Sequence, residues 1–101
     1  MDKPLFIDLI PKTLPLMGID TAIHKSKIKD FGEFNYGTEE ITLQWKLKDR
    51  SAKMTLIHEI VNSGFLRSGL HEKLNDMEME ESICRMMETL FYPLIDFKFE
   101  K

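Results

Sequence analysis

The residues of this chain best suited to chemistry lie in residues 55–62, TLIHEIVN. This stretch follows the H-E-x-x-H zinc motif at His58 and Glu59 but has Asn62 in place of the second histidine. On a helix, positions four apart share one face, so both histidines of the complete motif reach one zinc ion while the glutamate polarises the metal-bound water. His58 is therefore a candidate metal ligand, and Glu59 is a candidate general base.

Asn62 damages this ligand set because zinc prefers nitrogen, sulfur or carboxylate ligands to a neutral amide oxygen. The longer pattern H-E-x-x-H-x-x-G-x-x-H is excluded because Phe65 and Ser68 stand where it needs glycine and histidine. The other common third ligand is a carboxylate from a following helix. A third ligand would therefore come from elsewhere in the chain.

Glu80 and Glu81 open the second predicted helix and are the candidate carboxylate ligands. At 100° per residue, Glu80 lies roughly 55° from the centre of the apolar stripe in residues 83–94, and Glu81 lies roughly 155° from it. The pattern favours Glu80 and keeps Glu81 as an alternative. His71, from the connecting loop, and His24, from the sheet, are further replacements for the missing histidine.

An interpretation without metal is also open. Residues 71–75, HEKLN, repeat H-E-x-x-N in a polar segment where nothing else indicates a metal site. Residues 55–62 differ because apolar residues surround them, and a buried His-Glu pair is unfavourable unless partners satisfy it. Without metal, His58 would lie on the flank of its helix and bond to Glu80 or to the sheet.

Composition limits the classes of function. The 101 residues predict one domain over residues 1–101, and 43% hydrophobic with 31% charged residues is typical of a globular protein. A net charge of -3 argues against a non-specific nucleic-acid binder.

The single cysteine, Cys84, excludes an intrachain disulfide and a cysteine zinc cage, and fits a reducing cytoplasm. Asp8 and Pro11 interrupt the N-terminal apolar run, so we expect no signal peptide, and no run of about 18 apolar residues predicts a membrane span.

Hydrophobic periodicity changes near Asp49, from two to about 3.6 residues. Strands are predicted at residues 5–10, at residues 21–28, around Phe34 and Tyr36, and at residues 40–47. Residues 11–15 are predicted to form an edge strand and a loop, and Asn35 and Gly37 predict a turn. In residues 40–47, the inward side chains are Ile41, Leu43, Trp45 and Leu47.

Two helices are predicted next, at residues 52–68 and 77–95. Asp49 to Ser51 supply the cap residues at the start of the first helix, and Gly69 is its C-cap. Pro93 should bend or shorten the end of the second helix. The first buries the stripe Ile57, Ile60, Val61, Gly64 and Phe65; the second buries Ile83, Met86, Met87, Leu90, Phe91 and Leu94. Met77 and Met79 are expected to be exposed. The predicted fold class is a small α+β domain, with a three- or four-stranded antiparallel sheet followed by two helices.

The segments GEFNYG, EITLQ, TLIHEIVN and EESICRMMETLFYPL, in this order, resemble the short phage and prophage members of the ImmA/IrrE family of zincin-like metallopeptidases. The resemblance covers residues 30–95. It implies a zincin-like core, with His58 as first zinc ligand, Glu59 as catalytic base and Glu80 or Glu81 as carboxylate ligand. Asn62 departs from the second histidine, which leaves zinc binding weak or absent.

Three functions follow from these observations. The first is a pseudo-metallopeptidase with a degenerate motif that binds a host or repressor protein in the host cytoplasm. The second is an active zinc peptidase that uses His58, Glu59 and a glutamate of the second helix. The third is a structural or assembly protein without metal. We expect a protein partner, with no nucleic acid and no membrane, and place the pseudo-metallopeptidase first because of Asn62.

Overall fold

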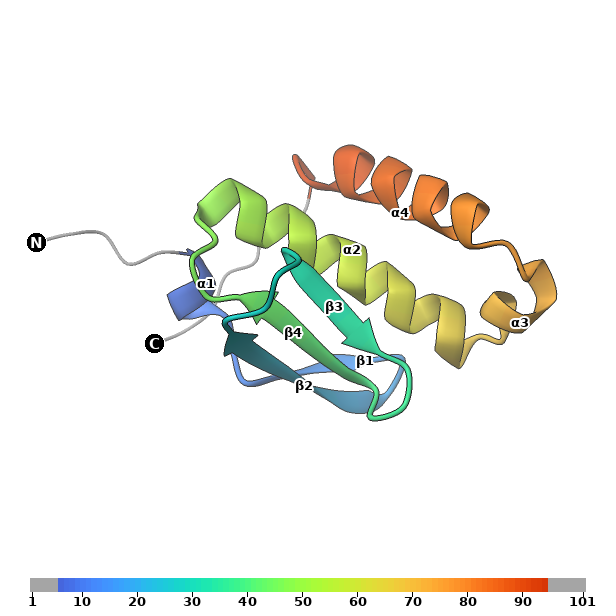
Figure 1. Cartoon of the computed structure of the whole chain (residues 1–101), viewed down its shortest axis with the longest axis horizontal. Helices are drawn as coiled ribbons and strands as arrows, with labels where there is room; N and C mark the ends of the chain where they lie inside the picture. Colours follow the sequence, from blue (N-terminus) through green and yellow to red (C-terminus); the bar gives the residue numbers. More distant parts are fainter. Residues whose placement is uncertain (1–5, 95–101) are drawn as a thin grey trace, which may run out of the picture.

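Helix α2 lies between a four-stranded sheet and helix α4 in the computed structural model, which describes residues 6–94 (Figure 1). The elements in chain order are α1 (Phe6–Leu9), β1 (Thr13–Leu16), β2 (Ile19–Ser26), β3 (Gly32–Asn35), β4 (Glu40–Gln44), α2 (Asp49–Arg67), α3 (Leu70–Leu74) and α4 (Met77–Phe91). The α+β class predicted from the sequence is confirmed. None of the helices within the described range is long and apolar enough to cross a bilayer.

The sheet has the order β1-β2-β4-β3 and is mixed. β1 pairs with β2 and β3 pairs with β4, both antiparallel, whereas β2 and β4 run parallel. The all-antiparallel sheet was therefore a wrong prediction at this central pair. Ile41 and Leu43 of β4 are fully buried, and a strand buried in this way is most stable with a neighbour on each side. β4 takes that central place.

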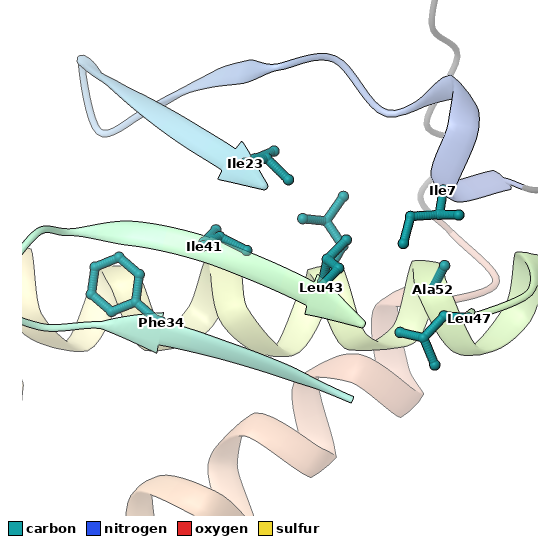
Figure 2. Close-up of a cluster of buried hydrophobic side chains, with 8 residues drawn as sticks. Ile7, Ile23, Phe34, Ile41, Leu43, Leu47 and Ala52 are labelled. Carbon is teal, nitrogen blue, oxygen red and sulfur yellow. The ribbon is translucent and has the colours of Figure 1, made fainter. Parts of the chain in front are cut away.

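The hydrophobic core lies between the sheet and α2 (Figure 2). Ile41, Leu43 and Leu47 are buried, as the alternation in residues 40–47 predicts. Trp45 is not buried: it follows the last residue of β4, Gln44, and is 44% exposed. The Lys27 and Lys46 ammonium groups lie 5.5 and 5.2 Å from the centre of its ring, so it is a surface aromatic with cationic neighbours.

The strand predicted at residues 5–10 is wrong in its described part, which forms the one-turn helix α1. Ile7 is fully buried, and the Phe6 backbone N–H donates to the Asp49 carboxylate at the start of α2. Burying Ile7 on α2 explains why this segment leaves the sheet. The edge position goes to β1, whose Pro15 suits an edge strand because it offers no N–H to a neighbour.

The other strands lie close to their predicted positions. β2 begins and ends two residues earlier than residues 21–28, and β3 ends before Tyr36. The predicted turn is confirmed, because Asn35 Oδ1 accepts from the N–H groups of Gly37 at 2.8 Å and Thr38 at 3.0 Å.

Helix α2 begins at Asp49, so the predicted cap residues form its first turn. Gly69 follows its C-terminus with φ of 82°, a left-handed conformation suited to glycine. Ile57 and Phe65 are buried as predicted, whereas Ile60, Val61 and Gly64 are only half-buried. The buried face of α2 instead includes several polar side chains: Thr55, Glu59 and Ser63.

Helix α4 departs most from the sequence prediction. Only Glu80 and Cys84 are buried on it, while Met86 is 56%, Leu90 54% and Leu94 73% exposed. The predicted core stripe was therefore wrong for these three residues, because α4 packs mainly on α2 and turns another face inward. We call the exposed side chains Met79, Met86 and Leu90 the apolar flank of α4.

The ends of α4 differ from the prediction too. The helix stops at Phe91, two residues before Pro93, and Ile95 lies outside the described residues. The loop expected before it contains the short helix α3, which ends at Leu74 and is followed by Asn75 in a left-handed conformation.

Arg67 ties the end of α2 to the sheet. Its side chain is 5% exposed, and its guanidinium donates to Glu39 Oε1 at 3.0 Å, Thr21 Oγ1 at 2.7 Å and the Leu16 carbonyl at 3.2 Å. A planar guanidinium suits this role because its donors point in several fixed directions. Arg67 thereby links α2 to β1, β2 and the turn before β4.

We predict that Arg67→Met lowers the free energy of unfolding by about 2 kcal/mol, because the buried Thr21 hydroxyl and the Leu16 carbonyl lose this donor. Urea denaturation followed by circular dichroism measures this. The matched control is Arg85→Met, which removes an exposed arginine from α4. Equal losses in both variants would show that the Arg67 contacts add nothing specific.

Candidate functional site

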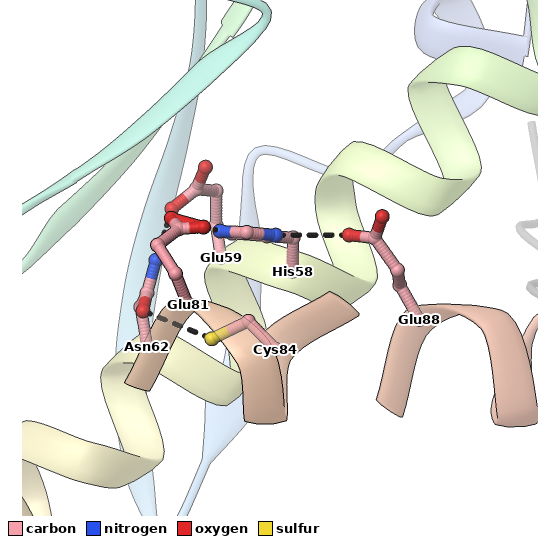
Figure 3. Close-up of polar contacts among 6 residues, drawn as sticks. All are labelled: His58, Glu59, Asn62, Glu81, Cys84 and Glu88. Atoms are coloured by element: carbon pink, nitrogen blue, oxygen red, sulfur yellow. Dashed lines mark hydrogen bonds and ion pairs between the residues drawn. The ribbon is translucent and has the colours of Figure 1, made fainter. Parts of the chain in front are cut away.

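His58 lies between two carboxylates of α4 (Figure 3). Its Nδ1 is 2.9 Å from Glu88 Oε2, and its Nε2 is 3.1 Å from Glu81 Oε1. Ionised carboxylates only accept hydrogen bonds, so both ring nitrogens must carry a proton to satisfy both partners. The arrangement therefore favours the imidazolium form of His58.

Burial alone would lower the pKa of His58, but the hydrogen bond to Glu88 and the charges of Glu59, Glu81 and Glu88 outweigh it, and the pKa is raised above 6.5. Proton binding by His58 thus stabilises the fold fully below about pH 6.5. This contribution is lost as the pH rises through the folded-state pKa.

Glu59 is 4% exposed and receives a hydrogen bond from Asn62 Nδ2 at 2.9 Å. Burial raises the pKa of Glu59, whereas the Asn62 hydrogen bond and the charge of His58 act in the opposite direction. The backbone of β3 lies directly over this carboxylate at Gly32. A Cβ there would be 3.2 Å from Glu59 Oε2 and only 2.5 Å from Thr55 Cγ2, so glycine permits the close approach.

Asn62 also contacts α4. The Cys84 thiol donates to Asn62 Oδ1 at 3.2 Å, so the oxygen and the nitrogen of this amide each have a partner. Burial, reinforced by nearby glutamates, raises the pKa of Cys84 to about 12. The thiol is therefore neutral at physiological pH, and a neutral thiol is a poor nucleophile.

Glu80, the favoured carboxylate ligand, pairs with His71 rather than with His58. Its Oε1 pairs with His71 Nδ1 at 2.8 Å, and the residue is 3% exposed. Glu81, the alternative to Glu80, is the one of these two glutamates that pairs with His58. The buried face of α4 centres on Glu80 and Cys84 rather than on the apolar stripe, and Glu81 lies at the edge of that face, where it reaches His58.

The two remaining histidines pair with glutamates away from His58. His24 pairs with Glu40 at 3.2 Å on the exposed side of the sheet, and His71 is committed to Glu80. The sequence prediction missed Glu88 and gave Cys84 no role at the site. Their spacing from Glu81, i+3 for Cys84 and i+7 for Glu88, places all three on one helix face and was a usable signal.

These residues do not fit a zinc centre with three protein ligands as they are folded. Within residues 6–94, no three His, Cys, Asp or Glu side chains form a group that could hold a metal ion. Asn62 presents its N–H to Glu59, and both nitrogens of His58 face carboxylates. What the arrangement supports is a network of ion pairs and hydrogen bonds that joins α2 to α4.

Two cavities open beside this network, of about 360 and 380 Å³, and both are lined by His58, Glu59, Gly32 and Glu81. Cavities of this size admit a small ligand or a protruding side chain.

Comparisons with protein-family models, with curated proteins and with solved structures give no match. The resemblance to the ImmA/IrrE family rests on the motif and the order of the elements alone.

We predict that Glu88→Gln lowers the pKa of His58, because burial remains while a charged hydrogen-bond acceptor is lost. NMR titration of the imidazole resonances measures this change. The variant should also lose less stability than the wild type between pH 6 and 8. Glu78→Gln, at an exposed position of α4, is the control with the same change of charge. An unaltered His58 titration in Glu88→Gln would contradict the ion pair.

Proposed function

We propose that this chain is a zincin-like pseudo-metallopeptidase, in which a polar network replaces the zinc centre, and that it acts by binding a host or repressor protein. The observation that carries the proposal is the position of Asn62. Its amide donates to Glu59 at 2.9 Å and accepts from Cys84 at 3.2 Å, so the residue that replaces the second histidine is part of the α2–α4 contact.

The state of the other motif residues supports the same function. His58 has a carboxylate at each ring nitrogen, which favours a cation that cannot ligate a metal. Glu59 is buried with one oxygen held by Asn62, whereas a general base must reach a water molecule. The network stabilises the helix pair without requiring catalysis.

The surface of α4 supports a protein partner. Met79, Met86 and Leu90 are 47%, 56% and 54% exposed on one flank of the helix. Methionine-rich exposed surfaces adapt to different partners because the side chain is flexible and polarisable. The net charge of -3 makes a nucleic acid an unfavourable partner by comparison.

A zinc-dependent metallopeptidase is the second candidate, and one observation favours it. The contact between His58 Nδ1 and Glu88 is the type of hydrogen bond by which carboxylates orient metal-binding histidines, and it directs Nε2 toward Glu81. In that function, Glu81 would be the carboxylate ligand and Glu59 the general base.

Metal content separates the two candidates. We predict that untagged protein purified without chelators contains substoichiometric zinc by inductively coupled plasma mass spectrometry, with the same content in His58→Ala. His71→Ala is the matched histidine control. Stoichiometric zinc that is lost in His58→Ala and retained in His71→Ala would overturn the proposal in favour of the peptidase.

We predict that Asn62→His raises the affinity for zinc by at least about 100-fold, because loss of even an outer-shell partner changes metal affinity by 10- to 100-fold and a direct ligand contributes more. Isothermal titration calorimetry with zinc measures the change. Asn75→His completes the same H-E-x-x-H pattern in residues 71–75, where position 75 follows the end of α3, and is the control. If the Asn62 variant gains no affinity, then position 62 does not share a site with His58 and Glu81.

A further inference from the structure

The cavity of about 380 Å³ lies between β3, α2 and the start of α4, and we call it the acidic cavity. Its lining includes five carboxylate side chains and two aromatic rings: Asp30, Glu33, Glu59, Glu80, Glu81, Phe34 and Tyr36. Its one basic side chain, His58, is already paired with Glu81 and Glu88. The cavity therefore has an excess of negative charge.

Glu80 indicates that this charge is incompletely satisfied. The residue is 3% exposed, and its Oε2 is buried without a hydrogen-bond partner among the described residues, while Oε1 pairs with His71. A buried carboxylate oxygen without a donor is unfavourable by several kcal/mol in general, so such atoms usually meet a ligand or water. Because Glu80 lines the acidic cavity, its unpaired oxygen points to a donor that enters through this cavity.

The aromatic residues define the shape of the site. Phe34 and Tyr36 pack edge to face with ring centres 5.4 Å apart, and Tyr36 also contacts the His71 ring at 4.7 Å. Burial, followed by the charges of Glu80 and neighbouring groups, raises the pKa of Tyr36, which agrees with a negative potential around its hydroxyl. Aromatic faces beside carboxylates attract a flat cation.

We propose that the acidic cavity receives an arginine side chain of the protein partner. A guanidinium has five donors in a planar fork, pairs with carboxylates, stacks on aromatic rings and is more weakly hydrated than an ammonium group. The proposal rests on the proposed function, because it names the chemistry of the partner that the same site binds. Glu80 Oε2 is the acceptor that the guanidinium would satisfy.

The test is a titration of ¹⁵N-labelled full-length protein with N-acetyl-arginine amide at low salt, followed by NMR chemical shifts. N-acetyl-citrulline amide, which is nearly isosteric but uncharged, is the matched probe. We expect saturable shifts at Gly32, Tyr36 and Glu80 with the arginine probe, and at least about tenfold weaker binding of the citrulline probe, since charged hydrogen bonds are about twice as strong as neutral ones.

Two isosteric variants locate the site. Glu80→Gln should weaken binding of the arginine probe at least about tenfold, while Glu78→Gln, an exposed change on the same helix, should leave it within about twofold. If Glu80→Gln fails to fold, Glu33→Gln at the exposed rim replaces it, with an expected loss of about threefold.

Three results would overturn the inference: no saturable shift with the arginine probe, equal binding of the citrulline probe, or equal losses in the Glu80 and Glu78 variants. None of them alters the zinc measurement. If the protein contains no zinc and does not bind the arginine probe, the proposed function stands but the acidic cavity is not its binding site. Stoichiometric zinc on His58 would remove the proposed function itself.

Discussion

The helical half of the molecule depends on two buried carboxylates, Glu59 on α2 and Glu80 on α4. Removing a carboxylate from water costs several kcal/mol unless donors replace the water, so each must have a partner close by. Asn62 donates a hydrogen bond to Glu59 at 2.9 Å, and His71 pairs with Glu80 at 2.8 Å. The short helix α3 carries His71, so the position of the α2–α4 connection and the orientation of α4 follow from the same requirement.

Local patterns predicted much of the fold. The alternation around Ile41 and Leu43 located β4, the 3.6-residue period located α2, and Asn35 predicted its turn, because each signal is contained in a few neighbouring residues. The parallel pairing of β2 with β4 and the orientation of α4 depend on contacts between distant segments. For α4, hydrophobicity predicted the wrong inward face, since the partners of Glu80 and Cys84 outweigh the burial of Met86 and Leu90.

The same division applies to the candidate site. The motif on α2 placed His58, Glu59 and Asn62 together because helical spacing is fixed. Glu81 entered only as the less favoured of two adjacent glutamates, and Glu88 did not enter at all, because their roles require the orientation of a second helix. The amide of Asn62 illustrates the limit: its residue type indicated a missing ligand, but its bonds to Glu59 and Cys84 required the assembled structure.

The sheet consists of two hairpins, β1–β2 and β3–β4, which meet only along the parallel ladder from Ile23–Ile41 to Ser26–Gln44. Each hairpin is local in the chain, whereas the ladder between them closes a longer loop and is slower to form for reasons of entropy. The topology therefore joins two local hairpins through one non-local ladder. α2 follows directly from β4 and covers the sheet, so the helix that carries the motif also holds the hairpins together (Figure 1).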